Sequence, residues 1–62
     1  MRQADINRVN KAKEKLQAAF GKLCDIKWEN ISGLEDNLRS KAKESLIAAD
    51  RYLDDIININ KD

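Results

Sequence analysis

The chain has no histidine, no proline and a single cysteine, Cys24, among its 62 residues. One cysteine cannot form an internal disulfide, and without histidine the usual ligand set of a structural zinc site is incomplete. Histidine-based catalysis is excluded as well, and the two glycines, Gly21 and Gly33, do not form a phosphate-binding loop. The sequence therefore predicts a non-enzymatic protein with no catalytic residues, no metal and no cofactor.

Long apolar runs are also missing from the chain. No segment approaches the roughly 18 apolar residues that span a bilayer. The residues from Met1 to Asp5 lack the apolar core of a signal peptide, so we expect a cytoplasmic protein that does not enter a membrane. With 42% hydrophobic and 37% charged residues, the composition is typical of helical bundles and coiled coils.

A repeated phrase is the most prominent feature that is present. Residues 11–19 read KAKEKLQAA and residues 41–49 read KAKESLIAA. Aligned over their full length, segments 1–30 and 31–60 are identical at 12 of 30 positions, whereas unrelated segments of this composition match at roughly two to four. The chain is therefore predicted to contain two similar units of about 30 residues.

Each unit spaces its apolar residues alternately three and four positions apart, which is the heptad pattern of helices that pack side by side. In the first unit the predicted seam is Val9, Ala12, Leu16, Ala19, Leu23 and Ile26. In the second unit it is Leu38, Ala42, Leu46, Ala49, Leu53 and Ile56.

These patterns predict an all-α fold in one domain, 1–62, with helices over 3–28 and 33–58 and a turn over 29–32. Ser32 and Glu35 match a capping box at the start of the second helix. A turn this short makes the helices antiparallel, as a helical hairpin. Two alternatives remain open: one continuous helix of about 60 residues, and three short helices with the first ending at Gly21.

Several apolar side chains lie outside the predicted seams, and a lone hairpin cannot cover them. We expect self-association, with two hairpins forming a four-helix bundle in which alanines face larger residues. A docking strip for a different protein is the alternative. The predicted partner or oligomer surface comprises Phe20, Trp28, Ile47, Tyr52, Ile57 and Ile59.

Charge divides between the units although the net charge is only +1. Residues 1–28 hold seven Lys/Arg against three Asp/Glu, and residues 29–62 hold five against eight. Attraction between oppositely charged helices explains this division. An alternative is a nucleic-acid face made by Arg8, Lys11, Lys15 and Lys22. In length and core alternation the chain resembles the Rop-type hairpin dimers that bind paired RNA loops.

A second resemblance covers about residues 20–44, on the order Phe20-Gly21-Lys22-Leu23, Asp25, Trp28, Ile31, Gly33, Asp36, Leu38, Lys41 and Glu44. This order is similar to that of the CsbD-like family of small bacterial stress-response proteins. Ser40 stands where that family has a glycine, and no aromatic-glycine pair follows Glu44. The resemblance implies a soluble, stress-associated protein, and it transfers no functional residues.

Three further side-chain predictions concern the ends of the hairpin. Trp28 should close one end of the core, and Cys24 beside it should be partly buried. The carboxylates of Asp50, Asp54 and Asp55 should form a solvated face and not a metal site. The sequence thus favours a helical protein that acts through self-association and protein contact, with a small RNA- or DNA-binding regulator as the alternative. The family resemblance implies a role in stress adaptation.

Overall fold

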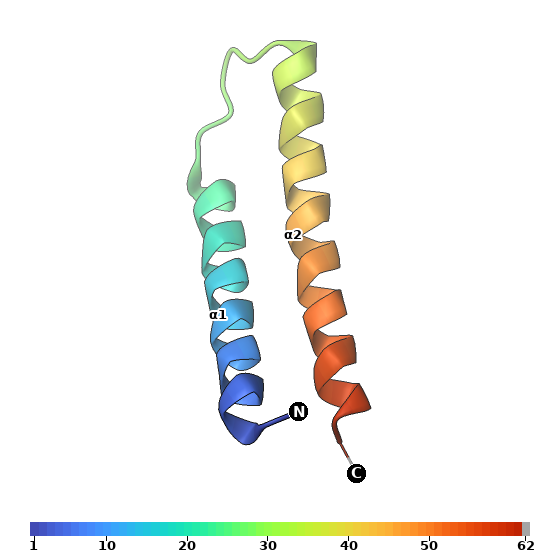
Figure 1. Ribbon diagram of the computed structural model, residues 1–62. Helices are drawn as coiled ribbons and strands as arrows, with labels where there is room; N and C mark the ends of the chain where they lie inside the picture. Colours follow the sequence, from blue (N-terminus) through green and yellow to red (C-terminus); the bar gives the residue numbers. More distant parts are fainter. Residues whose placement is uncertain (62) are drawn as a thin grey trace.

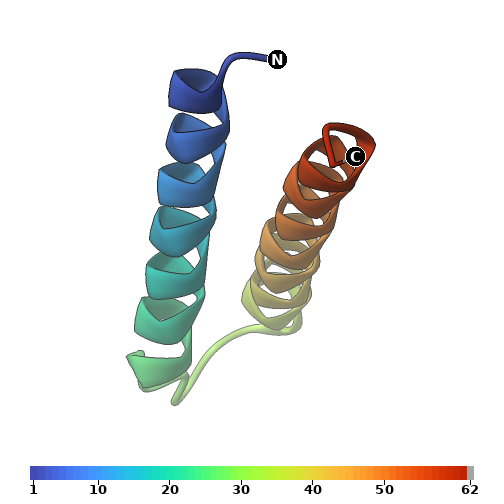
Figure 2. The same cartoon turned by 90° about the horizontal axis from the view of Figure 1, so that it is seen from below.

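The computed structural model describes residues 1–61 and contains two α-helices in this range, α1 (Gln3–Asp25) and α2 (Gly33–Ile59), with no strand. The helices run antiparallel, with the connecting segment at one end and both termini at the other (Figure 1). Seen from below, they again lie side by side (Figure 2). The predicted all-helical hairpin is confirmed, and the predictions of one continuous helix or three short ones are wrong.

α1 ends at Asp25 and not near residue 28. Ile26 takes an extended conformation, with φ −68° and ψ 132°. The indole Nε1 of Trp28 donates a hydrogen bond to the carbonyl oxygen of Leu23 at 3.1 Å. The same carbonyl accepts a hydrogen bond from the Ile26 backbone N–H at 3.3 Å, so the indole adds a second donor at the last turn of the helix. In the connection that follows, Asn30 adopts φ 55°, a left-handed conformation that asparagine tolerates better than most residues.

α2 begins at the residue that the sequence indicates. The Ser32 hydroxyl accepts a hydrogen bond from the Glu35 backbone N–H at 3.1 Å, and the Glu35 carboxylate accepts one from the Ser32 N–H at 3.5 Å. The capping box is therefore confirmed. Glu35 and Asp36 add negative charge to the first turn, where the helix dipole favours it.

The contact between the helices, which we call the hairpin seam, follows a heptad register different from the predicted one. In α1 its half-buried members are Ile6, Val9, Lys13, Leu16, Phe20 and Leu23. In α2 they are Arg39, Lys43, Leu46, Asp50, Leu53 and Ile57.

Five of the twelve residues of the predicted seam are exposed and lie outside the hairpin seam. Ala12, Leu38, Ala42 and Ile56 are exposed, and Ile26 is exposed and outside α1. No residue within 1–61 is fully buried. A lone hairpin consequently leaves its apolar side chains only partly covered.

Gly21 lies inside α1 and offers a test of helix stability. A methyl group added there would meet no atom within 4 Å, and the backbone is helical. Replacing Gly21 with Ala is expected to raise the free energy of unfolding by about 0.5–1 kcal/mol, because alanine has the higher helix propensity. Thermal unfolding followed by circular dichroism checks this, and a lower melting temperature would contradict it.

Candidate interaction surfaces

The hairpin seam carries an ion pair near its middle. Lys13 on α1 pairs with Asp54 on α2, and its side chain is only 19% exposed. The hydrogen bond that Lys13 donates to the Asp54 carboxylate raises the pKa of Lys13 above its usual 10.5, and the charges of Asp54 and Asp50 act in the same direction. One Asp50 oxygen, Oδ1, is shielded from solvent and has no hydrogen-bond partner within residues 1–61. The predicted solvated face is thus wrong for Asp50, which is part of the seam. Asp54 pairs with Lys13 but keeps 48% of its side chain exposed.

The raised pKa of Lys13 predicts a dependence of stability on pH. A lysine whose pKa is higher in the folded chain stabilises the fold fully below pH 10.5, and this contribution is lost as pH rises through the folded value. Stability measured by urea unfolding should therefore fall above that pH. The stability of the variant Asp54→Asn should fall less over the same pH range. Equal losses of stability in both proteins would contradict the role of this ion pair.

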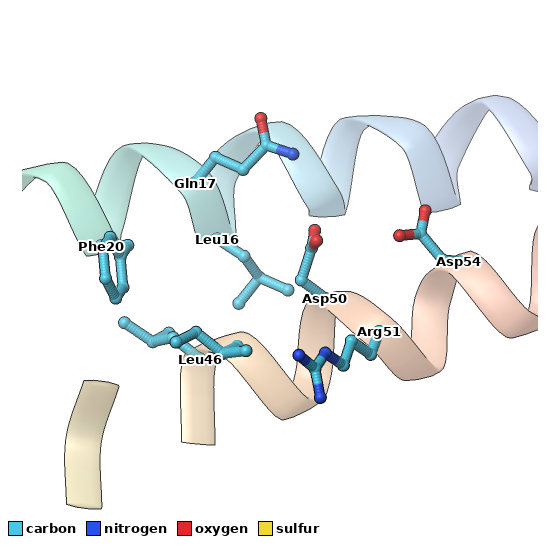
Figure 3. A pocket seen from close by; sticks show the side chains of 8 residues that line it. Leu16, Gln17, Phe20, Leu46, Asp50, Arg51 and Asp54 are labelled. Carbon is cyan, nitrogen blue, oxygen red and sulfur yellow. The ribbon is translucent and has the colours of Figure 1, made fainter. Parts of the chain in front are cut away.

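One side of the seam opens into a groove of about 420 Å³. Leu16, Phe20 and Leu46 form its apolar part, and the carboxylates of Asp50 and Asp54 lie further along it (Figure 3). The helix positions that flank the seam on this side are mostly polar, and Ile47 is the one large apolar residue among them. We call the polar ones the polar flank: Asn10, Gln17, Ser40 and Asp54.

The opposite side of the seam is apolar. In an antiparallel pair, both helices present the same heptad position on a given side of the seam. Ala19 and Ala49 are half-buried there, Ala12, Ala42 and Ile56 are exposed, and Asp5 and Glu35 occupy this position at the two ends. We call this side the alanine flank: Ala12, Ala19, Ala42, Ala49 and Ile56.

A row of large side chains borders the alanine flank on α2. Leu38, Tyr52 and Ile59 lie seven or fourteen positions apart, with Ser45 between the first two, so they share one helix face. Their exposed fractions are 54%, 69% and 81%. This outer row of α2 continues the alanine flank into a wider apolar surface.

The structure brings only some of the predicted partner residues together: Phe20 and Ile47 line the same groove, and Ile47 and Tyr52 line a second hollow on α2. Phe20 and Ile57 belong to the hairpin seam, Ile47 is 43% exposed, and Trp28 lies in the connection. Two of the predicted residues, Tyr52 and Ile59, belong to the outer row of α2. The repeated phrase contains the alanines of the alanine flank. The sequence analysis placed them in the contact between the two helices of one hairpin, and so missed the alanine flank as a separate surface.

The predicted nucleic-acid residues do share one surface. Arg8, Lys15 and Lys22 are spaced by seven, Lys11 lies beside them, and all four are exposed on the side of α1 that faces away from the seam. Arg8 pairs with Asp5 at 3.0 Å. No ion pair within residues 1–61 involves the three lysines.

The connected end of the hairpin combines an aromatic ring with a cation. The Arg39 guanidinium lies 5.6 Å from the centre of the Trp28 ring, within the range of a cation–π interaction, and Arg39 also pairs with Asp36. Trp28 is half-buried against this end, whereas Cys24 is exposed. The predicted partial burial of Cys24 is therefore wrong, because Cys24 lies seven residues after Gln17, on the same exposed side of α1 as the polar flank.

Comparison with known proteins identifies no relative: no family model, curated protein or solved structure matches the chain. Neither α1 nor α2 is long and apolar enough to cross a membrane. Within residues 1–61 no cluster of cysteine and carboxylate side chains is arranged to hold a metal ion. The surfaces described above are thus the basis for assigning a function.

Proposed function

We propose that this protein has no enzymatic activity and acts by binding protein, and that it first binds a second copy of itself to form a four-helix bundle. The single observation that carries the proposal is the amount of surface that the hairpin leaves exposed. The chain exposes 5094 Å². A compact monomer of its 7.1 kDa mass exposes about 4,100 Å².

The excess of about 1,000 Å² compares well with a protein interface. A stable interface covers about 800 Å² on each partner. One partner of similar size would therefore bring the hairpin to the exposure expected of a folded protein. The absence of any fully buried residue in 1–61 supports the same conclusion, because a helical domain without a buried core is only marginally stable.

The two flanks differ in a way that selects the side for the partner. In the seam, the leucines share with Arg39 the heptad position nearer the alanine flank, whereas Lys13, Lys43 and Asp50 share with Ile6, Phe20 and Ile57 the position nearer the polar flank. A partner on the alanine flank would cover leucines and alanines and leave Lys13, Lys43 and Asp50 in water. The leucines concerned are Leu16, Leu23, Leu46 and Leu53.

Sedimentation equilibrium tests this proposal. Between about 1 µM and about 500 µM, the mass is expected to rise from that of one chain to that of two, because an interface of this size gives dissociation constants in or below the micromolar range. A mass of 7.1 kDa at every concentration would contradict self-association.

A second candidate function is nucleic-acid binding through Arg8, Lys11, Lys15 and Lys22. It is favoured by the exposure of all four side chains on the outside of α1. Structured RNA and duplex DNA should be titrated at about 50 mM and about 200 mM salt, because phosphate contacts weaken as salt rises. The variant Lys15→Gln should weaken binding and the control Lys41→Gln, on α2, should not. Absence of binding at the lower salt rules this function out.

The resemblance to the CsbD-like family adds a biological setting to the proposal. It supports a role in stress adaptation in the cytoplasm, carried out through protein contacts. Growth of a deletion strain of the source organism under osmotic, heat and oxidative stress, with and without the gene restored, tests that role. Equal survival of the two strains under all three stresses would contradict it.

A further inference from the structure

We propose that two hairpins pack alanine flank against alanine flank with their connecting segments at the same end, so that α1 of each copy lies against α2 of the other. The inference rests on the proposed self-association and specifies its geometry. Two arrangements of the bundle are open to a symmetric dimer. In one, the connections share an end and the two copies of α1 are diagonal. In the other, the connections lie at opposite ends and the two copies of α1 are neighbours.

The charges of the helices favour the first arrangement. α1 holds five Lys/Arg and three Asp/Glu, a net charge of +2, and α2 holds four Lys/Arg and six Asp/Glu, a net charge of −2. With the connections at the same end, every pair of neighbouring helices has opposite charge. With the connections at opposite ends, one new contact joins two positive helices and the other joins two negative ones. Like charges side by side weaken such contacts.

The edges of the alanine flank lead to the same conclusion. On α1 this edge consists of Arg8, Lys15 and Lys22, so neighbouring copies of α1 would bring six cationic side chains together. On α2 the corresponding edge is the uncharged outer row. Lysine and arginine stems can lie over apolar side chains while their charges stay in water.

The heights of the residues along the bundle axis also favour the first arrangement. Because Lys13 faces Asp54, residues of α1 and α2 whose numbers add to about 67 lie at the same level. A two-fold axis along the bundle preserves these levels. It therefore places Lys15 beside the partner's Tyr52, and Arg8 beside the partner's Ile59. A lysine over a tyrosine ring adds a cation–π contact.

This geometry also decides between the two candidate functions. When the copies of α1 are diagonal, the row of Arg8, Lys15 and Lys22 in one copy lies on the opposite side of the bundle from the same row in the other copy. No single face of the bundle then contains both rows. When they are neighbours, both rows share one face that could follow a nucleic-acid backbone. The proposed arrangement thus favours protein partners over nucleic acid.

Distances between spin labels test the arrangement. Glu29 is exposed in the connecting segment, and the variant Glu29→Cys in a Cys24→Ser background carries one label on each copy. With connections at the same end, the labels should be about 20–30 Å apart, since neighbouring helix axes are about 8–10 Å apart. With connections at opposite ends, the separation approaches the 49 Å length of the hairpin.

A salt titration provides a second measurement that needs no label. The proposed arrangement predicts that the dissociation constant of the dimer rises about three- to tenfold between low and high salt, because opposite charges are screened. A dimer that tightens with salt, or labels near 49 Å apart, would overturn the arrangement and leave self-association standing. A monomer at every concentration would overturn both.

Discussion

Replacing Ala19 with arginine is expected to raise the dissociation constant of the dimer at least about 100-fold, because a large charged side chain would enter the alanine flank. Ala19 is half-buried and its methyl group is small enough for another helix to approach. The helix itself should persist, since arginine and alanine both have high helix propensity. Sedimentation equilibrium measures the dissociation constant, and far-ultraviolet circular dichroism measures the helix content.

The neighbouring residue supplies the matched control. Ala18 is exposed on the outer side of α1, away from both the seam and the alanine flank. Ala18→Arg changes the charge, size and helix propensity by the same amounts as Ala19→Arg, and the two differ only in position. It should leave the dissociation constant within about threefold of the original value. Equal weakening by both substitutions would show that the alanine flank is not the interface.

Much of the hairpin could be predicted from local sequence signals. Ser32 and Glu35 determine the start of α2 through short-range hydrogen bonds, and those bonds are present. The end of α1 could not be placed the same way. Trp28 folds back to the Leu23 carbonyl oxygen, and nothing in the spacing of residues indicates that contact.

The register of the seam was wrong for a definite physical reason. Counting apolar residues passes over Lys13 and Lys43, although both occupy the seam in the structure. A lysine stem is aliphatic and can cover a neighbouring helix, and Lys13 also gains an ion pair with Asp54. The count therefore selected Ala12 and Ala42 in their place. That choice rotates the predicted contact by about 50° around each helix, toward the alanine flank.

The rotation explains why the interaction surface was misplaced. The predicted seam combines the leucines that lean toward the alanine flank with the alanines of the flank itself. As a prediction of the contact within one hairpin, the predicted seam is only partly correct. In the proposed four-helix bundle the same residues would form the central core, where small and large side chains alternate between layers. More residues of the repeated phrase would then lie in the contact between two hairpins than in the contact within one hairpin.

Replacing Leu46 with alanine is expected to lower the free energy of unfolding by about 2–5 kcal/mol at concentrations where the dimer forms, because the side chain would then be fully enclosed. Leu46 is only half-buried in the single hairpin. In a protein that stays monomeric, the loss should therefore be nearer about 1–2 kcal/mol. The size of the loss thus reports whether a partner covers the leucine.

Leu34→Ala is the control for this measurement. Leu34 is 68% exposed in the first turns of α2 and faces away from the alanine flank, so its loss should be below about 0.5 kcal/mol. Urea unfolding at several protein concentrations measures both variants under conditions that separate hairpin from dimer. If Leu46→Ala costs no more than Leu34→Ala, Leu46 does not pack in the seam. If its cost stays near 1–2 kcal/mol at the highest concentration, no second hairpin covers it.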